Sequence, residues 1–109
     1  MSYNDLRKGR YSQSGRLYFI TAVTRQRVPC FSDFYCARLL VNQLREIHRQ
    51  SQLDSLAWVV MPDHFHWLFQ LGDQTSLSEV MRSVKARTAI AVNDHLHRQG
   101  ALWQKSYYD

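Results

Sequence analysis

The sequence has few of the residues that characterise secreted or membrane proteins. Its 109 residues include only two cysteines, Cys30 and Cys36, and their spacing fits neither a disulfide framework nor a zinc knuckle. No run of about 18 apolar residues occurs, and the polar start MSYNDLRKGRYSQSGR has no hydrophobic segment of the signal-peptide type. We therefore expect a soluble, cytoplasmic protein without a membrane partner.

The chain also lacks internal repeats, low-complexity tracts and any linker-like stretch, so we expect one domain over residues 1–109. A hydrophobic content of 45% with 13% aromatic residues is enough to build a core. Fourteen Lys and Arg against nine Asp and Glu give a formal charge of +5 and a sequence pI near 9.6. This balance favours a polyanionic partner, with nucleic acid the first candidate.

Hydrophobic periodicity predicts four strands and two helices. The strands are expected over residues 17–24, over LAWVVMP as a near-continuous apolar run, over residues 64–71 after a Pro62-Asp63 turn, and over the final ALWQKSYYD. The first helix should run from a cap at Ser32 to about Arg49, with an apolar face of Phe34, Ala37, Leu40, Val41, Leu44 and Ile47.

The second helix should open with a capping box of Ser76 and Glu79 and end at Gly100, near His97 and Arg98. Its expected apolar face is Leu77, Val80, Met81, Val84 and Ala91. The resulting β-α-β-β-α-β order predicts a ferredoxin-like α+β fold, in which both helices cover one face of an antiparallel sheet. Function would then lie on the open face.

The stretch MPDHFHWLF places two histidines, His64 and His66, in an otherwise apolar strand. Because side chains alternate along a strand, both imidazoles should stand on one face while Phe65, Trp67, Phe69 and Leu71 enter the core. Two neighbouring imidazoles can ligate one cation, with Asp63, Gln70 or another element as a third ligand. Taken alone, however, such a pair is more often an exposed pair without a ligand.

Basic side chains could follow a phosphate backbone. The candidates are Arg7, Lys8 and Arg10 at the start, Arg25 and Arg27 after the first strand, and Arg82, Lys85 and Arg87 on the second helix. For the helical cations a simple solvated face is about equally plausible. Tyr11 is a guess for base stacking, and we expect His48, His95 and His97 to be structural or surface residues near helix ends.

From end to end the chain resembles the REP-associated tyrosine transposases, a bacterial branch of the single-tyrosine HUH transposases. The resemblance runs through RKGRYSQSGRLYFITAVTRQRVPCF, WVVMPDHFHWL, MRSVKARTA and GALWQKSYYD. It implies a metal-dependent nuclease and strand transferase that acts on single-stranded DNA beside a palindromic hairpin. A tyrosine would form a 5′-phosphotyrosine link, and His64 and His66 would hold Mg²⁺ or Mn²⁺. No nucleotide cofactor is needed.

The nucleophilic tyrosine of that family lies on a helix after the YYD strand, whereas this sequence stops at Asp109. Tyr107 and Tyr108 match the strand, so the resemblance carries no nucleophile onto them, and we favour aromatic packing at the strand end. We expect a transposase core that lacks its catalytic helix, with weakened metal affinity and doubtful cleavage. Exposed apolar sheet surface could then favour a homodimer.

Two other functions remain open. A non-catalytic module could bind single-stranded nucleic acid on the open sheet, with His64 and His66 stacking on or hydrogen-bonding to bases. A metallohydrolase unrelated to DNA is disfavoured, because no cluster of third and fourth ligands and no HExxH helix appears. Metal dependence of a covalent DNA adduct would separate the transposase from the binding module.

Overall fold

The strands and helices follow the order that the sequence predicts. The structure, a computed structural model, describes residues 15–50 and 53–108. Its strands are β1 (Leu17–Thr24), β2 (Leu53–Met61), β3 (His64–Leu71) and β4 (Trp103–Tyr108), and its helices are α2 (Phe34–Arg49) and α3 (Leu77–Leu96). Two short 3₁₀ turns, η1 (Arg25–Arg27) and η2 (Cys30–Ser32), connect β1 to α2.

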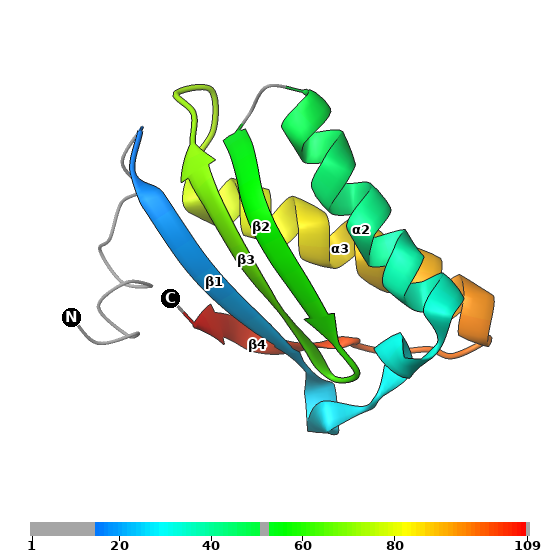
Figure 1. Cartoon of the computed structure of the whole chain (residues 1–109). Coiled ribbons are helices and arrows are strands. Elements are labelled where there is room, and N and C mark those ends of the chain that lie inside the picture. The colour runs from blue at the N-terminus through cyan, green and yellow to red at the C-terminus, as the bar shows by residue number, and fades with distance from the viewer. Residues whose placement is uncertain (1–14, 51–52, 109) are drawn as a thin grey trace.

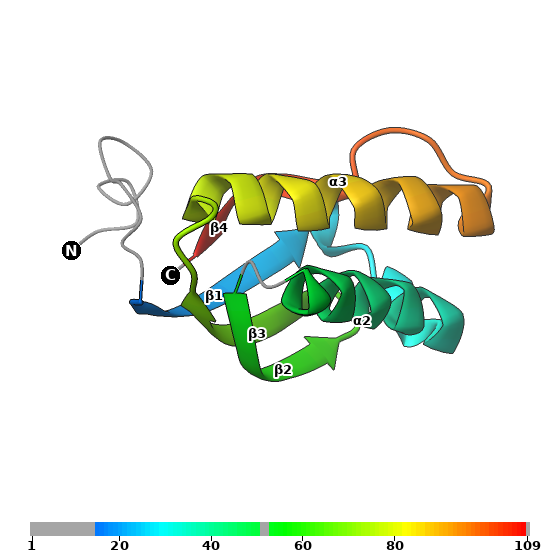
Figure 2. The same cartoon turned by 90° about the horizontal axis from the view of Figure 1, so that it is seen from above.

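The four strands form one sheet in the order β2-β3-β1-β4, and every neighbouring pair is antiparallel. Both helices pack on the same side of this sheet, and no helix or strand of residues 15–50 and 53–108 covers its other face (Figures 1 and 2). The ferredoxin-like α+β fold is therefore confirmed. Neither described helix is long and apolar enough to cross a membrane.

Alternation along β3 separates the core from the open face. Phe65, Trp67 and Phe69 are fully buried beneath the helices, and the residues between them point the other way. The indole Nε1–H of Trp67 donates to Ser55 Oγ at 2.9 Å, so this buried polar group keeps a partner. The predicted inward set of β3 is confirmed, and the two histidines consequently stand on the open face.

The helix ends differ in part from the prediction. Asp33 caps α2, where Ser32 was expected, because the Asp33 carboxylate accepts the amide N–H groups of Tyr35 at 2.8 Å and Cys36 at 3.2 Å. Ser76 caps α3 as predicted.

The end of α3 lies near His97, as predicted, but Gly100 is not the residue that terminates the helix. The helix ends at Leu96, where His97 adopts a left-handed backbone with φ of 54°. Gly100, expected to end the helix, lies beyond it on the way to β4.

The buried faces also differ in three places. Phe34 is 73% exposed, and Cys36 is buried in its stead, because Cys36 lies one helical turn before Leu40 on the buried face, whereas Phe34 lies well round the helix from it. Thr88 and Val92, rather than Ala91, complete the buried face of α3. The strand β2 begins earlier, at Leu53, and its apolar run is not uniformly buried. Val59 and Met61 are exposed on the open face beside His66 and His64, and Leu56 is exposed where the register with β3 shifts.

Candidate metal and nucleic-acid site

His64 and His66 meet on the open face at the centre of the sheet. Their ring centroids lie 4.9 Å apart with an edge-on angle of 77°, and both residues are partly buried. The antiparallel register sets their neighbours, which are Val23 and Met61 beside His64, and Thr21 and Val59 beside His66. Because β3 pairs with β1 on one side and with β2 on the other, the two imidazoles stand on a rigid strand.

His64 is oriented by the residue before it. Its Nδ1 lies 2.7 Å from Oδ1 of Asp63, and Oδ2 of Asp63 lies 3.2 Å from the Arg27 guanidinium. The hydrogen bond from His64, together with Arg27, holds the pKa of Asp63 below its usual range. Since an ionised carboxylate only accepts hydrogen bonds, Nδ1 of His64 donates to Asp63, and Nε2 is the ring nitrogen left for a ligand.

An unusual backbone turn brings Arg27 to this position. Gln26 and Arg27 both adopt left-handed conformations, with φ of 56° and 52°. Non-glycine residues rarely occupy this region, and strain of this kind often accumulates beside functional sites. The turn directs Arg27 back toward Asp63, so a predicted DNA-binding residue lies at the edge of the histidine pair.

His66 is oriented from the neighbouring strand. Oγ1 of Thr21 lies 2.8 Å from Nδ1 of His66. When Nδ1–H donates to this hydroxyl, Nε2 of His66 presents its lone pair, as Nε2 of His64 does. The exposed ring of Phe19 lies 5.6 Å from the His66 ring and extends the surface along β1.

This donor set fits a divalent cation. The Nδ1 atoms are both engaged by orienting partners, which is the usual arrangement of metal-binding histidines. Of the two third ligands considered from the sequence, Asp63 is adjacent but already paired with His64 and Arg27. Gln70 is not brought to the pair: it lies four residues beyond His66, roughly 13 Å along the strand, and donates to Gly15 O. The remaining ligands would be water or phosphate oxygens.

The other predicted DNA contacts are dispersed. Arg7, Lys8, Arg10 and Tyr11 lie outside the described residues. Arg25 is exposed in η1. Arg82 and Lys85 line a groove between α3 and β4, where Lys85 Nζ donates to Gln104 O at 2.8 Å, and Arg87 lines a crevice between α2 and α3. These helical cations therefore lie in the helical layer, away from the open face.

The two final tyrosines point in different directions. Tyr107 packs against the core, in agreement with the predicted aromatic packing. Tyr108 is 48% exposed and pairs in register with Thr21, the residue that contacts His66. Tyr108 thus lies one strand away from the histidine pair, on the same face.

Sequence reasoning missed Thr21 as the residue that orients His66, and it named Arg27 only as a DNA contact and not as a partner of Asp63. Thr21 and Arg27 come from β1 and η1, and their contacts depend on register and on a strained turn that no local pattern encodes. One signal was available for Thr21: a single polar residue on the outward side of an otherwise apolar strand, LYFITAVT.

Comparison with known proteins finds similar folds and a matching family. No curated protein matches the sequence. The fold is similar to a REP-associated tyrosine transposase bound to a REP hairpin, with a TM-score of 0.73 and 23% identity over 91% of this chain, which spans 57% of that protein. It is also similar to a putative transposase from Deinococcus radiodurans R1, with a TM-score of 0.70 and 28% identity, covering 93% of this chain and 82% of the other.

The sequence model of the family described as "Transposase IS200 like" matches residues 12–109 and so includes every element of the sheet and both helices. The chain belongs to the IS200-like transposase family.

Proposed function

We propose that this chain provides the metal-binding and DNA-binding core of a transposase that acts on single-stranded DNA, preferentially next to a hairpin. The observation that carries the proposal is the pair of oriented imidazoles, His64 and His66, on the open face of a sheet from this family. A divalent cation, Mg²⁺ or Mn²⁺, would be held by their Nε2 atoms. Bound there, it would polarise a phosphodiester and stabilise the charge that develops on its oxygens.

The protein groups around the pair have separate tasks in this proposal. Asp63 and Thr21 fix the ring orientations, so little reorganisation is needed when a phosphate approaches. Arg27, 65% exposed at its side chain, lies beside Asp63 and can contact a neighbouring phosphate. Phe19, 53% exposed beside His66, offers a ring on which an unpaired base can stack.

Hairpin DNA is proposed as the partner because a similar fold occurs in a transposase bound to a REP hairpin. The positive net charge of +5 is consistent with a polyanion. We assign no nucleophile among residues 1–109, since the resemblance places the family's tyrosine after the strand that ends at Tyr108.

The exposed Phe19 also supports the second candidate function, binding of single-stranded nucleic acid without cleavage. Base stacking on an aromatic residue contributes roughly 1–3 kcal/mol per base and needs no metal. Under this alternative, binding would survive chelation, because the imidazoles of His64 and His66 would contact bases directly and not through a metal.

Labelled single-stranded hairpin oligonucleotides mixed with the chain and Mn²⁺ test both functions, with denaturing and native gels run in parallel. The proposal predicts retention in the native gel that depends on Mn²⁺ and falls at least tenfold in the His66→Ala variant. Retention that is unchanged by a chelator would overturn the metal-dependent function and favour the binding module.

The denaturing gel detects a covalent adduct between a nucleophilic side chain and DNA. We expect no covalent adduct from this chain. A chelator-sensitive adduct that Tyr108→Phe abolishes would show that the exposed tyrosine on the open face attacks DNA, and would contradict the proposed absence of a nucleophile. His97→Ala, an exposed histidine away from the sheet, is the matched control for the histidine substitutions.

A further inference from the structure

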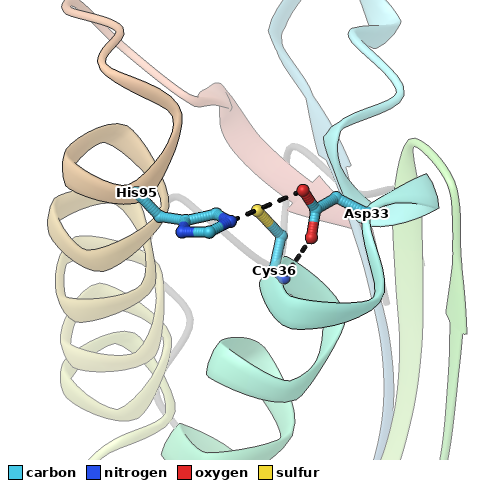
Figure 3. A group of neighbouring side chains, drawn as sticks. All are labelled: Asp33, Cys36 and His95. Carbon is cyan, nitrogen blue, oxygen red and sulfur yellow. Dashed lines mark hydrogen bonds and ion pairs between the residues drawn. The ribbon is translucent and has the colours of Figure 1, made fainter.

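A second cluster of metal-ligating side chains lies where the start of α2 meets the end of α3. Asp33 is the cap of α2, Cys36 lies in its first turn, and His95 lies in the last turn of α3. One ligand atom from each, a carboxylate oxygen, the thiol sulfur and an imidazole nitrogen, lies within 4.8 Å of the others (Figure 3). The cluster is in the helical layer, on the other side of the sheet from His64 and His66.

The three side chains point toward one another (Figure 3). Oδ1 of Asp33 accepts the amide N–H groups of Tyr35 and Cys36, and Oδ2 lies 3.5 Å from Nε2 of His95. The Tyr35 ring packs on the His95 ring with centroids 4.4 Å apart and so restricts its rotation. Figure 3 shows the Cys36 sulfur beside the line that joins the imidazole to the carboxylate.

A simple ion pair leaves part of this arrangement unexplained. Charge-assisted hydrogen bonds between nitrogen and carboxylate usually measure about 2.7–2.9 Å, whereas Asp33 and His95 stop at 3.5 Å. Zinc binds sulfur at about 2.3 Å and imidazole nitrogen at about 2.0–2.1 Å, which places tetrahedral ligand atoms roughly 3 to 4 Å apart. The observed spacing is therefore close to a ligand set, and small side-chain rotations would complete it.

The burial of the three residues also favours an ion over a larger ligand. Cys36 is fully buried, while the side chains of His95 and Asp33 are 37% and 39% exposed. A macromolecular substrate cannot reach the sulfur, but an ion entering between the imidazole and the carboxylate can. The exposed side leaves a fourth coordination position for water.

We propose that Asp33, Cys36 and His95 form a binding site for a thiophilic divalent cation such as Zn²⁺. Thiolate, imidazole and carboxylate are all zinc ligands, and the thiol would lose its proton to solvent on binding. The ion would join the first turn of α2 to the last turn of α3. Because it would bind the folded chain, it would raise the free energy of unfolding as its concentration exceeds the Kd. This inference does not rest on the proposed action on DNA.

Titration of the full 109-residue chain with Co²⁺, a spectroscopic substitute for Zn²⁺, tests the site. We expect a thiolate-to-Co²⁺ charge-transfer absorption that saturates at one equivalent and is displaced by Zn²⁺. The Cys36→Ser variant should lose this absorption, whereas Cys30→Ser, the matched control at the other free and buried cysteine, should keep it. His64→Ala should also keep it, which separates this site from the open face.

Two milder variants guard against loss of folding. Asp33→Asn keeps the helix cap, because asparagine caps helices as well as aspartate, and His95→Gln changes a partly exposed residue. Each should weaken Co²⁺ binding at least tenfold and reduce the Zn²⁺-induced rise in Tm. No thiolate absorption in the wild-type chain, its loss in Cys30→Ser, or unchanged affinity in both milder variants would overturn the proposal.

Discussion

Thr21 and His66 are 45 residues apart in the sequence, yet Oγ1 of Thr21 lies 2.8 Å from Nδ1 of His66. This contact crosses from β1 to β3 and engages Nδ1 of His66, so that Nε2 is the ring nitrogen left for a ligand. Partners of this kind usually change metal affinity by about 10- to 100-fold when they are removed. Thr21 is therefore the residue beyond the histidines that most directly probes the proposed site.

We predict that Thr21→Val weakens Mn²⁺ binding on the open face about tenfold, because the imidazole of His66 loses the group that fixes its orientation. Isothermal titration with Mn²⁺ measures this effect. Unchanged affinity in Thr21→Val would show that the hydroxyl does not orient the ring. Thr88→Val, the same substitution in the core, is the matched control and should leave Mn²⁺ binding unaltered.

Thr88 itself gives a prediction on stability. It is fully buried in α3, and its hydroxyl has no hydrogen-bond partner among the described residues. A buried hydroxyl without a partner costs about 1–3 kcal/mol, so Thr88→Val should leave stability unchanged or raise the free energy of unfolding by about 1 kcal/mol. Urea denaturation measures this change in the free energy of unfolding. A clear loss of stability in Thr88→Val would contradict the prediction and would indicate that the Thr88 hydroxyl does form a hydrogen bond.

The start of α2 can be tested with two substitutions. Phe34 is 73% exposed, whereas Leu40 is fully buried, although periodicity placed both on one apolar face. Leu40→Ala should cost about 2–5 kcal/mol through lost burial and a cavity. Phe34→Ala should cost less than about 1 kcal/mol, mainly its contact with Arg38. Denaturant unfolding measures both changes. Equal losses of unfolding free energy in Phe34→Ala and Leu40→Ala would contradict the exposed position of Phe34.

Cys30 makes the fold sensitive to alkali. Burial, aided by the nearby Cys36, raises the pKa of its thiol from 9.0 to about 11. Between these two values the unfolded chain releases a proton that the folded chain retains, so stability is fully present below pH 9.0 and falls as the pH rises toward about 11. The loss should approach roughly 2 to 3 kcal/mol.

Chemical unfolding at pH 8 and at pH 11 measures this loss. The Cys30→Ala variant should show a smaller decrease between the two pH values, since it has no thiol to ionise there. An equal decrease in the variant and the wild-type chain would assign the alkaline sensitivity to other groups.

Much of the fold could be predicted because, in β3 and at the start of α3, the local sequence pattern and the tertiary structure favour the same conformation. The alternation in HFHWLFQL determined which residues of β3 are buried and which face carries His64 and His66. Ser76 and Glu79 marked the start of α3 for a local reason, a hydrogen bond across three residues.

The differences arose where long-range structure decides. Two adjacent residues, Ser32 and Asp33, can both cap a helix, and the path of η2 selects the second. Val59 is exposed because it pairs with His66 on the face that no helix covers, which is a property of the assembled sheet. The contact of His95 with Asp33 joins distant segments and has no local signal. The contact of His66 with Thr21 was indicated only by one polar residue on the outward side of β1.

The most direct measurement follows the imidazole signals of the five histidines by NMR while Mn²⁺ is added in small, substoichiometric amounts. A paramagnetic ion broadens the signals of the rings that bind it, even when binding is weak. If the open face is the metal site, the signals of His64 and His66 broaden first and together, while that of His48, whose Nδ1 accepts from the Ser55 amide on the far side of the sheet, stays sharp. Sharp signals from His64 and His66 while other imidazoles broaden would contradict a metal site on this face.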